Sequence, residues 1–289
     1  MSPYETAEGL RRAIEVRLVE KSRSEGARFL PRLRRAVVFE RIVTRLEAAE
    51  PGQWIPKGGL ALEWRLGTVA RTTKDLDLVV RAARRDAAGI HERLRGALAH
   101  SADGDHFVFE ISPPEDLAAD ALGRAGYRFR VEARMAGRRF ERVQLDVVPR
   151  DDEVFAVDSL RLPATLDFAG IKPPTVELAS PAQHFAEKLH ALTRDYGEHP
   201  NTRVRDLVDL MLLIERHLVK HADAFAAARH VFRIRATHAL PAAIPDPPAA
   251  WVEDYPREAA SCGVEAKTIE DALSILRSFW TAARAVDER

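Results

Sequence analysis

The stretch "RTTKDLDLVV", residues 71–80, places two aspartates in a segment that otherwise has the composition of a buried β-strand. Successive side chains of a strand point to opposite faces, so Asp75 and Asp77 share one face while Leu76 and Leu78 share the other. Two like charges on one face repel each other, and a bound cation removes that cost. Carboxylate oxygens are hard ligands that select Mg²⁺ or Mn²⁺. The pattern predicts either a metal site or an exposed strand face on which both carboxylates are solvated.

A glycine pair lies upstream of this strand, in "KGGLALEWRLG" at 57–67. Apolar spacing after Gly58 predicts a short helix that Gly67 ends. A helix that opens on two glycines lets a phosphate approach bare backbone N–H groups at the positive end of the helix dipole. Taken alone, Gly58 and Gly59 are more typical of a tight turn than of a phosphate site.

A third carboxylate, Asp146 in "VQLDVVP", lies in another segment with the pattern of a strand. Its side chain is expected on the same strand face as that of Gln144, whereas Val143, Leu145 and Val147 form the opposite, apolar face. A strand with two acids, an apolar strand with one acid and a helix that opens on glycines form a far rarer combination than any one of them. The combination favours a functional site over three unrelated features.

Helices and strands alternate in the first part of the chain. Apolar spacing predicts helices within residues 6–50, and Gly26 and Pro31 indicate a division into two. A further helix is expected at 86–100, and two strands within 127–148 are joined by a turn at 136–138. This interleaving predicts a lobe of the α+β class.

A Pro-rich, aperiodic stretch at 162–181 is expected to lead into a second, helical lobe. Ser180 and Gln183 form a capping box at its first helix, with Pro181 at the first helical position. Two more amphipathic helices are predicted in "TRVRDLVDLMLLIERHL" and "IEDALSILRSFWTAARAV", separated by a Pro-dense loop. We therefore expect two lobes, at residues 1–170 and 171–289.

Charge and cysteine content exclude some classes of protein. The 44 Lys and Arg residues balance the 44 Asp and Glu residues, so a nucleic acid or membrane could be bound only through a local patch. The single cysteine, Cys262, rules out a disulfide framework and is expected to be an inert thiol. No apolar run approaches the roughly 20 residues that span a bilayer. We expect a cytoplasmic protein without a membrane partner.

The order of these motifs resembles the nucleotidyltransferase fold of polymerase-beta-like enzymes, in which GG is followed by D-x-D on one strand and a single D on a later strand. More specifically, "KGGLALEWRLGTVARTTKDLDLVV" resembles the motif of the AbiEii/AbiGii toxin family, which reads GG-x-A-L and then R-x-S/T-x-D-h-D. The later "AEKLHAL" and "RVRDLVDL" resemble C-terminal motifs of the same family. The similarity spans roughly residues 50–215.

The resemblance implies a role for each matched residue of the first lobe. Gly58 and Gly59 would contact the nucleotide phosphates, and Asp75 and Asp77 would hold Mg²⁺ or Mn²⁺. Asp146 would be the third metal-binding acid, nearest the attacking hydroxyl. Its assignment depends on the strand pattern more than on a motif, because the spacing to the third acid varies.

Further roles follow for residues beside these motifs. Lys188 would reach the triphosphate from the second lobe, and Asp206 would be a further acid of the cleft. Phosphate contacts are expected for Lys57, Arg71 and Thr73. Relatives often have Ser at the position of Thr73. A modification of the Thr73 hydroxyl could switch the site off, because a phosphate there would repel both the acids and the nucleotide.

Each of these assignments has an ordinary alternative. Lys188 could extend from a helix surface, and Asp206 could pair with Arg203 or Arg205 while Asp209, three residues on, plays no part in the site. His184, His190 and His199 have no neighbours at metal-ligand spacing, so we expect none of them to bind a metal.

Seven arginines against two glutamates lie between Arg124 and Arg142. Three of them, Arg128, Arg130 and Arg134, are expected on one strand face, which could follow an RNA backbone. An arginine-rich solvated hairpin is an equally good interpretation.

The resemblance implies a monomeric, Mg²⁺-dependent enzyme that transfers nucleotides from an NTP to an RNA acceptor. In relatives of the MenT type that acceptor is the tRNA 3′ end, so blocked translation is the implied outcome, and an AbiEi-like antitoxin is the implied partner. Two alternatives remain open: transfer to a small molecule or a protein, and a non-catalytic module that binds nucleotide or RNA.

Overall fold

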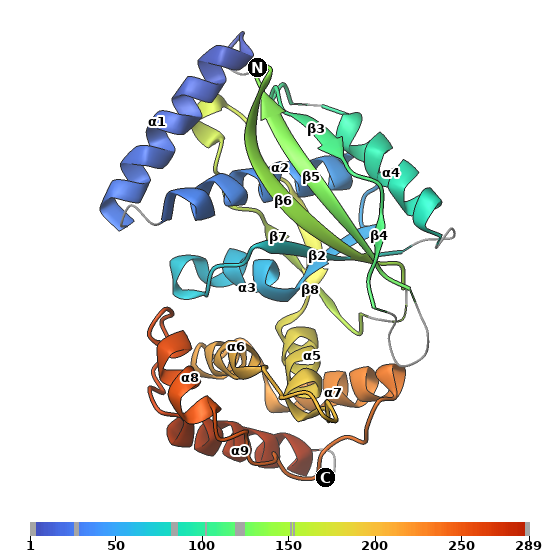
Figure 1. Cartoon of the computed structure of the whole chain (residues 1–289), viewed down its shortest axis with the longest axis vertical. Helices are drawn as coiled ribbons and strands as arrows, with labels where there is room; N and C mark the ends of the chain where they lie inside the picture. Colours follow the sequence, from blue (N-terminus) through green and yellow to red (C-terminus); the bar gives the residue numbers. More distant parts are fainter. Residues whose placement is uncertain are drawn as a thin grey trace.

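A computed structural model of the chain describes residues 4–25, 29–81, 86–101, 103–118, 125–150, 152 and 154–286. The upper part of Figure 1 contains a mixed β-sheet with helices packed against it, and the lower part is helical. Each part has its own cluster of buried apolar side chains. The expected α+β lobe and helical C-terminal lobe are both present.

The main sheet is built from strands that lie far apart in the sequence. Its strand order is β1-β2-β6-β5-β3, and β4 also pairs with β5. Strands β2 and β6 run parallel, and the other pairs described in this sheet are antiparallel. The strands are β1 (Trp54–Lys57), β2 (Asp75–Val80), β3 (Val108–Ile111), β4 (Glu115–Asp116), β5 (Tyr127–Met135) and β6 (Arg138–Val148).

The two faces of this sheet differ in polarity. Buried and partly exposed residues alternate along β5 and β6, as the sequence pattern predicts for strands with one buried face. Apolar residues such as Phe129 and Leu145 belong to the core that α2 and α4 cover, whereas Arg128 and Asp146 point to the other face. The polar face therefore stays available for a site.

The expected turn joins β5 to β6. Ala136 and Gly137 have φ values of 53° and 68°. Two successive residues with positive φ are the signature of a type I′ turn, which matches the twist of a hairpin.

The helices of the first lobe follow the predicted pattern. The expected N-terminal pair is present, with Pro31 in the first turn of the second helix, while Gly26 lies outside the described residues. Gly67, with φ of 63°, ends the helix that opens at Gly58. These helices are α1 (Ala7–Glu25), α2 (Leu30–Ala49), α3 (Gly58–Leu66) and α4 (Ala87–Ala99).

The Pro-rich stretch at 162–181 is not the aperiodic passage expected from the sequence. It contains β8 (Thr175–Ala179), which pairs with β7 (Val157–Arg161), and its side chains Leu162 and Leu166 are buried in the first core. Its prolines flank the strand rather than interrupt it, so the strand forms. The first core reaches Leu178, and the expected division after residue 170 stays a prediction.

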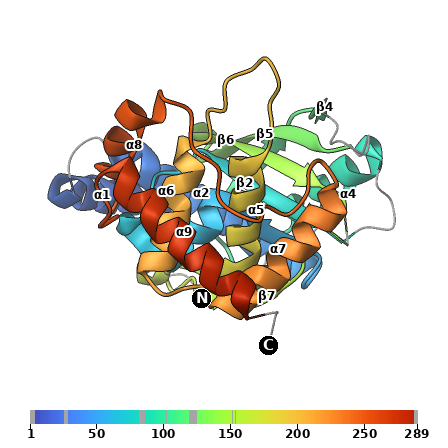
Figure 2. The ribbon, with the colours of Figure 1, turned by 90° about the horizontal axis from the view of Figure 1, so that it is seen from below.

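The second lobe contains two helices that the sequence analysis did not predict, α7 and α8. Figure 2 shows α9 lying across the lobe, where it packs on α6 and α7. The helices of this lobe are α5 (Pro181–Thr193), α6 (Val204–Glu215), α7 (His221–Arg235), α8 (Trp251–Ala259) and α9 (Ile269–Ala285). Among the described residues, no helix combines the length and apolar character needed to cross a bilayer.

The cap of α5 is half of the predicted capping box. The Ser180 hydroxyl accepts a hydrogen bond from the Gln183 backbone N–H at 3.1 Å, as expected. The Gln183 side chain does not return to Ser180, because it accepts from the Phe155 backbone N–H and donates to Glu187. The reciprocal contact was therefore wrongly predicted, since the Ser180 backbone N–H donates to the Ala156 carbonyl instead, at 3.0 Å.

Candidate functional site

Four charged residues form one row across the polar face of the sheet. Lys57 pairs in register with Asp77, Asp77 with Asp146, and Asp146 with Arg128. Residues paired in this way project from the same face, with Cβ atoms about 4.5–5.5 Å apart. Two carboxylates thus lie side by side between a lysine and an arginine. Asp75 lies on the same face, in register with Gln144 in the next row.

Asp146 is fully engaged by its arginine neighbour. Arg128 donates from Nε to Oδ1 at 2.9 Å and from Nη2 to Oδ2 at 2.7 Å. These hydrogen bonds raise the pKa of the Arg128 guanidinium. Bidentate pairing of this kind is among the stronger charge-assisted contacts. In this arrangement, a metal ion at Asp146 would share the carboxylate with Arg128 or displace one of its hydrogen bonds.

Asp77 and Asp75 have no such bidentate partner among the residues that the structure describes. Burial raises the pKa of Asp77 to about 6, against the opposing effect of Lys57 and Lys188. Burial, and then the negative charge of Asp146, raise the pKa of Asp75. A carboxylate with a raised pKa is short of positive charge in its surroundings.

Asp75 and Asp77 therefore fit a divalent cation by donor chemistry, since both are hard oxygen ligands in need of positive charge. Among the described residues, no group of three or more His, Cys, Asp or Glu side chains is close enough together to hold a metal ion.

The backbone at Gly58 lies directly against Asp77. Gly58 has φ of +64°, and a Cβ atom there would come within 2.1 Å of the Asp77 carboxylate oxygen Oδ2. A Cβ at Gly59 would lie 3.1 Å from the Thr73 hydroxyl. The glycine pair is thus required for the close approach of α3 to β2, which places the first backbone N–H groups of the helix beside the two acids.

Lys188 belongs to a buried charge cluster between α5 and α6. Its Nζ lies 2.7 Å from Asp206 Oδ1 and 3.1 Å from Asp209 Oδ2. Asp209 also accepts two hydrogen bonds from Arg71, at 2.9 and 3.0 Å. Arg71 precedes β2, so the cluster connects the two lobes.

The ionisation of this cluster follows from its pairing. Burial opposes the charge on Asp209, yet Lys188 and then Arg71 outweigh it and lower the pKa of Asp209 to about 2. Burial likewise opposes the charge on Lys188, while Asp209 and Asp206 raise its pKa. Lys188 thus remains a fixed cation beside Asp77.

Asp209 is the residue that the sequence analysis left out and the structure brings into the cluster. Its side chain is fully buried, at 0% exposure. Its position among the apolar residues of "LVDLMLLI" was a usable signal, since a carboxylate there must have a buried cation as partner. Arg71 donates two hydrogen bonds to Asp209. Its expected contact with a phosphate stays a prediction.

A cavity of about 340 Å³ opens between the lobes beside Asp77 and Gly58. Arg194 and Arg203, on the loop between α5 and α6, have no carboxylate partner in the described part of the chain. Their guanidinium groups lie 5.5 and 5.7 Å from the Tyr196 ring centre. The cations of the cavity wall are Lys57, Arg150, Lys188, Arg194, Arg203 and Arg235, and the acids are Asp77, Glu187 and Asp206.

Lys57 and Thr73 have partners within the protein. Lys57 Nζ lies 3.2 Å from Glu187, a second residue that the sequence analysis did not single out. The Thr73 hydroxyl donates to the backbone carbonyl of Asp75 at 3.1 Å, and Thr73 is buried at 9% exposure. Phosphate contact and modification at Thr73 both remain predictions, and each requires that the buried hydroxyl leave this hydrogen bond.

Four arginines of the β5–β6 hairpin pair with neighbouring acids, whereas Arg138 and Arg139 have no ion-pair partner in the described part of the chain. Besides the Arg128 pair with Asp146, Arg130 lies 2.5 Å from Glu115 and Arg134 lies 2.7 Å from Glu132. Arg124 lies outside the described residues. The structure therefore favours the solvated hairpin over the RNA-binding face.

His190, His199 and the cysteine have the surroundings expected for residues without a catalytic role, whereas His184 does not. Burial lowers the pKa of His184 to about 3, so it is neutral, but its buried Nε2 has no hydrogen-bond partner in the described part of the chain. His190 is hydrogen-bonded to Thr237. His199 is exposed. Burial raises the pKa of the Cys262 thiol, which suits an inert residue.

Comparison with known proteins agrees with this geometry. Residues 41–285 match the family model described as nucleotidyl transferase AbiEii toxin of a type IV toxin–antitoxin system. The chain belongs to the AbiEii nucleotidyltransferase toxin family. The family's activity is nucleotidyl transfer, its substrate an NTP and its partner an antitoxin. A search of curated proteins finds no match.

Two solved structures are similar to this AbiEii chain. MenT4, a nucleotidyltransferase toxin from Mycobacterium tuberculosis, is 19% identical with a TM-score of 0.53, and the alignment covers 94% of this chain and 98% of MenT4. JHP933 from Helicobacter pylori is 15% identical with a TM-score of 0.44, over 88% of this chain and 92% of that protein. The MenT4 likeness confirms the expected nucleotidyltransferase fold.

The raised pKa of Asp77 predicts a pH-dependent stability. An unfolded Asp has a pKa of about 3.9, so the folded protein binds this proton more tightly and loses stability as the pH rises from about 4 to about 6. We expect Asp77→Asn, in EDTA, to be more stable than the wild type by about 1–2 kcal/mol near pH 8 and equally stable near pH 4. Urea unfolding measures this, with exposed Asp167→Asn as the control. A gain that is the same at both pH values would contradict the prediction.

The contact between Gly58 and Asp77 predicts a coupling between the two positions. Gly58→Ala should cost about 1–2 kcal/mol for its left-handed backbone, plus the clash with the carboxylate. In an Asp77→Ala background the carboxylate is gone, so we expect a cost at least about 1 kcal/mol smaller. Urea unfolding of the four proteins gives the coupling.

Gly104 is the matched control, because it has φ of +68° with nothing within 4 Å of an added Cβ. Its replacement by Ala should cost the same in both backgrounds. Equal costs for Gly58→Ala with and without Asp77 would show that the close approach is unimportant.

Proposed function

We propose that this toxin transfers a nucleotide from an NTP to the hydroxyl of an RNA, the tRNA 3′ end being the foremost candidate, in a reaction that depends on Mg²⁺ or Mn²⁺. The observation that carries the proposal is the position of Asp75 and Asp77 between two basic hollows. One is the cavity beside Asp77, and the other is a groove beside Asp75. A nucleotidyl transfer to RNA needs a place for each of two polyanions on either side of its metal ligands.

The groove has a volume of about 500 Å³ and runs between the start of α2, the segment before β2, the start of α6 and the end of α8. Its cations are Arg32, Arg35, Arg71, Lys74, Arg205 and Arg257, and Glu258 is its one acid among the described lining residues. Arg35 and Lys74 have no ion-pair partner in the described part of the chain, and both lower the pKa of Asp75 against the effect of burial. Free positive charge thus lies next to the acid.

The reaction requires that a hydroxyl oxygen of the acceptor bond to the α-phosphorus while the bond between this phosphorus and the bridging oxygen breaks and pyrophosphate leaves. Asp75 and Asp77 would hold the cation, which activates the hydroxyl and neutralises the leaving group. Lys188 and Lys57 would bind the triphosphate from opposite walls of the cavity. Arg128 would release Asp146, which then accepts the hydroxyl proton.

An AbiEi-like antitoxin, a cytoplasmic location and a monomeric state belong to the same proposal, and they follow from the family resemblance and the composition. In the cell, a nucleotide added to tRNA would block its charging and stop translation.

The catalytic prediction is tested with purified protein, tRNA, Mg²⁺ and each labelled NTP in turn. We expect label on the tRNA, and we expect Asp75→Ala to lower the rate at least about a hundredfold because it removes a metal ligand. Exposed Asp167→Ala is the control and should keep the wild-type rate. Transfer only to a protein or a small hydroxyl compound would overturn the RNA assignment. Full activity of Asp75→Ala would overturn the metal site.

The groove makes a separate prediction about RNA affinity. Lys74→Glu should weaken tRNA binding at least about tenfold and reduce the salt dependence of binding by about one charge. Lys172→Glu has the same charge change on an exposed residue away from both hollows and should bind tRNA normally. If both variants bind tRNA equally well, the groove is not the RNA site.

A further inference from the structure

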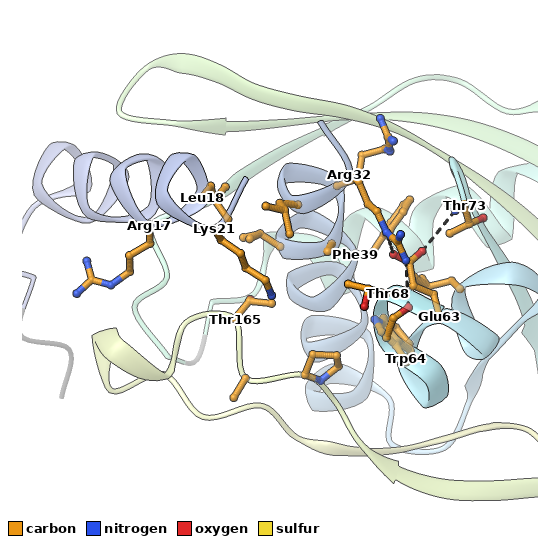
Figure 3. A pocket seen from close by; sticks show the side chains of 18 residues that line it. Arg17, Leu18, Lys21, Arg32, Phe39, Glu63, Trp64, Thr68, Thr73 and Thr165 are labelled. Atoms are coloured by element: carbon orange, nitrogen blue, oxygen red, sulfur yellow. Dashed lines mark hydrogen bonds and ion pairs between the residues drawn. The ribbon is translucent and has the colours of Figure 1, made fainter. Parts of the chain in front are cut away.

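A third hollow, of about 320 Å³, lies between α1, α2, α3 and residues 163–165, and it shares Arg32 and Arg35 with the proposed RNA groove (Figure 3). Its inner wall is apolar: Leu18, Val37, Phe39 and Leu60 are buried there, and Trp64 is half-buried. The volume lies at the small end of the roughly 300–1,000 Å³ range of ligand pockets. Such an apolar wall favours a ligand with an apolar body.

Positive charge surrounds this apolar wall. Arg17, Lys21, Arg32 and Arg35 line the cavity, and Glu63 is its one acid among the described lining residues. Lys21 extends from α1 toward Thr165, while Arg17 points away and lies 3.9 Å from the Phe168 ring centre (Figure 3).

Arg32 is paired with Glu63 at 2.7 Å. Arg35 differs, because its buried Nε has no hydrogen-bond partner in the described part of the chain. Arg35 also has no ion-pair partner in the described part of the chain, so an anion in the cavity can pair with its guanidinium group. The lining therefore has an apolar wall and an unsatisfied cation, which together select an anion with an apolar body.

The cavity is linked by hydrogen bonds to the metal-binding strand. Glu63 accepts from Arg32 and, at 3.4 Å, from the backbone N–H of Thr73, and Figure 3 draws these contacts as a chain. The Thr73 hydroxyl in turn donates to the backbone carbonyl of Asp75. Glu63 and Thr73 both line the cavity, so a ligand there touches the residues that position Asp75.

We propose that this cavity, lined by Trp64, Phe39, Lys21 and Arg35, binds a small organic anion with an apolar body, and that its occupancy alters the Asp75 site through Arg32, Glu63 and Thr73. The binding is independent of the proposed nucleotidyl transfer, whereas the effect on Asp75 depends on the metal site in that proposal.

Anilinonaphthalene sulfonate is a suitable probe, since it joins an apolar ring system to one anionic group. Fluorescence titration of the full chain should show one bound dye. Ala164→Phe, which narrows the cavity from an exposed position, and Arg35→Gln should each lower the dye affinity at least tenfold. Ala99→Phe and Arg12→Gln, both on exposed positions away from the cavity, are the matched controls and should stay within twofold. Circular dichroism establishes that all variants are folded.

The proposed site is overturned if the folded wild type binds no dye, or if Ala164→Phe and Arg35→Gln bind it as tightly as the controls. The link to Asp75 is tested by Mn²⁺ calorimetry: saturating dye should change the Mn²⁺ affinity of the wild type at least threefold and leave that of Ala164→Phe unchanged. An unchanged wild-type affinity overturns the link. If the wild type binds dye and no Mn²⁺, the proposed catalytic site fails and the anion site stands.

Discussion

The repulsion between two neighbouring carboxylates on the polar face of the sheet determines how this site is built. Asp77 and Asp146 are adjacent in register on parallel strands, where like charges destabilise the pairing. Lys57 and Arg128 occupy the two outer positions of the same row, so each acid has a cation on its far side. The two flanking cations offset the repulsion between the two central acids, so the metal-free sheet is electrically tolerable.

The helical lobe adds a second layer of compensation. Lys188 extends its positive charge to Asp77 while Asp206 and Asp209 hold it in place, and Arg71 balances Asp209 from the sheet lobe. A buried network of this kind contributes little to net stability, because desolvation offsets most of the attraction. Removing one member is far more damaging than the network is stabilising. Its role is therefore to define how the lobes meet at the cleft.

Much of the site could be predicted from sequence, because the strand and glycine patterns are local. Asp75 and Asp77 on one face, the turn at 136–138 and the α3 start at Gly58 all follow from short-range rules. The pairing of Arg128 with Asp146 required knowledge of which strands are neighbours.

The role of Asp209 likewise could not be predicted from local sequence. Its partners, Arg71 and Lys188, lie on other elements and are brought to it only by the fold. Helix α7 escaped prediction because its buried stripe is mostly alanine, which gives a weak apolar signal at helical spacing.

The register of β2 has a consequence for folding fidelity. Asp75 and Asp77 alternate with the fully buried Leu76 and Leu78. A slip of one residue against β6 would turn both carboxylates into the core and both leucines into the cleft. The misaligned sheet would expose the two leucine side chains to water and would also bury the two aspartate charges without solvent. The two proposed metal ligands therefore also disfavour the wrong strand register. A chain that forms this sheet stably has both carboxylates on the polar face.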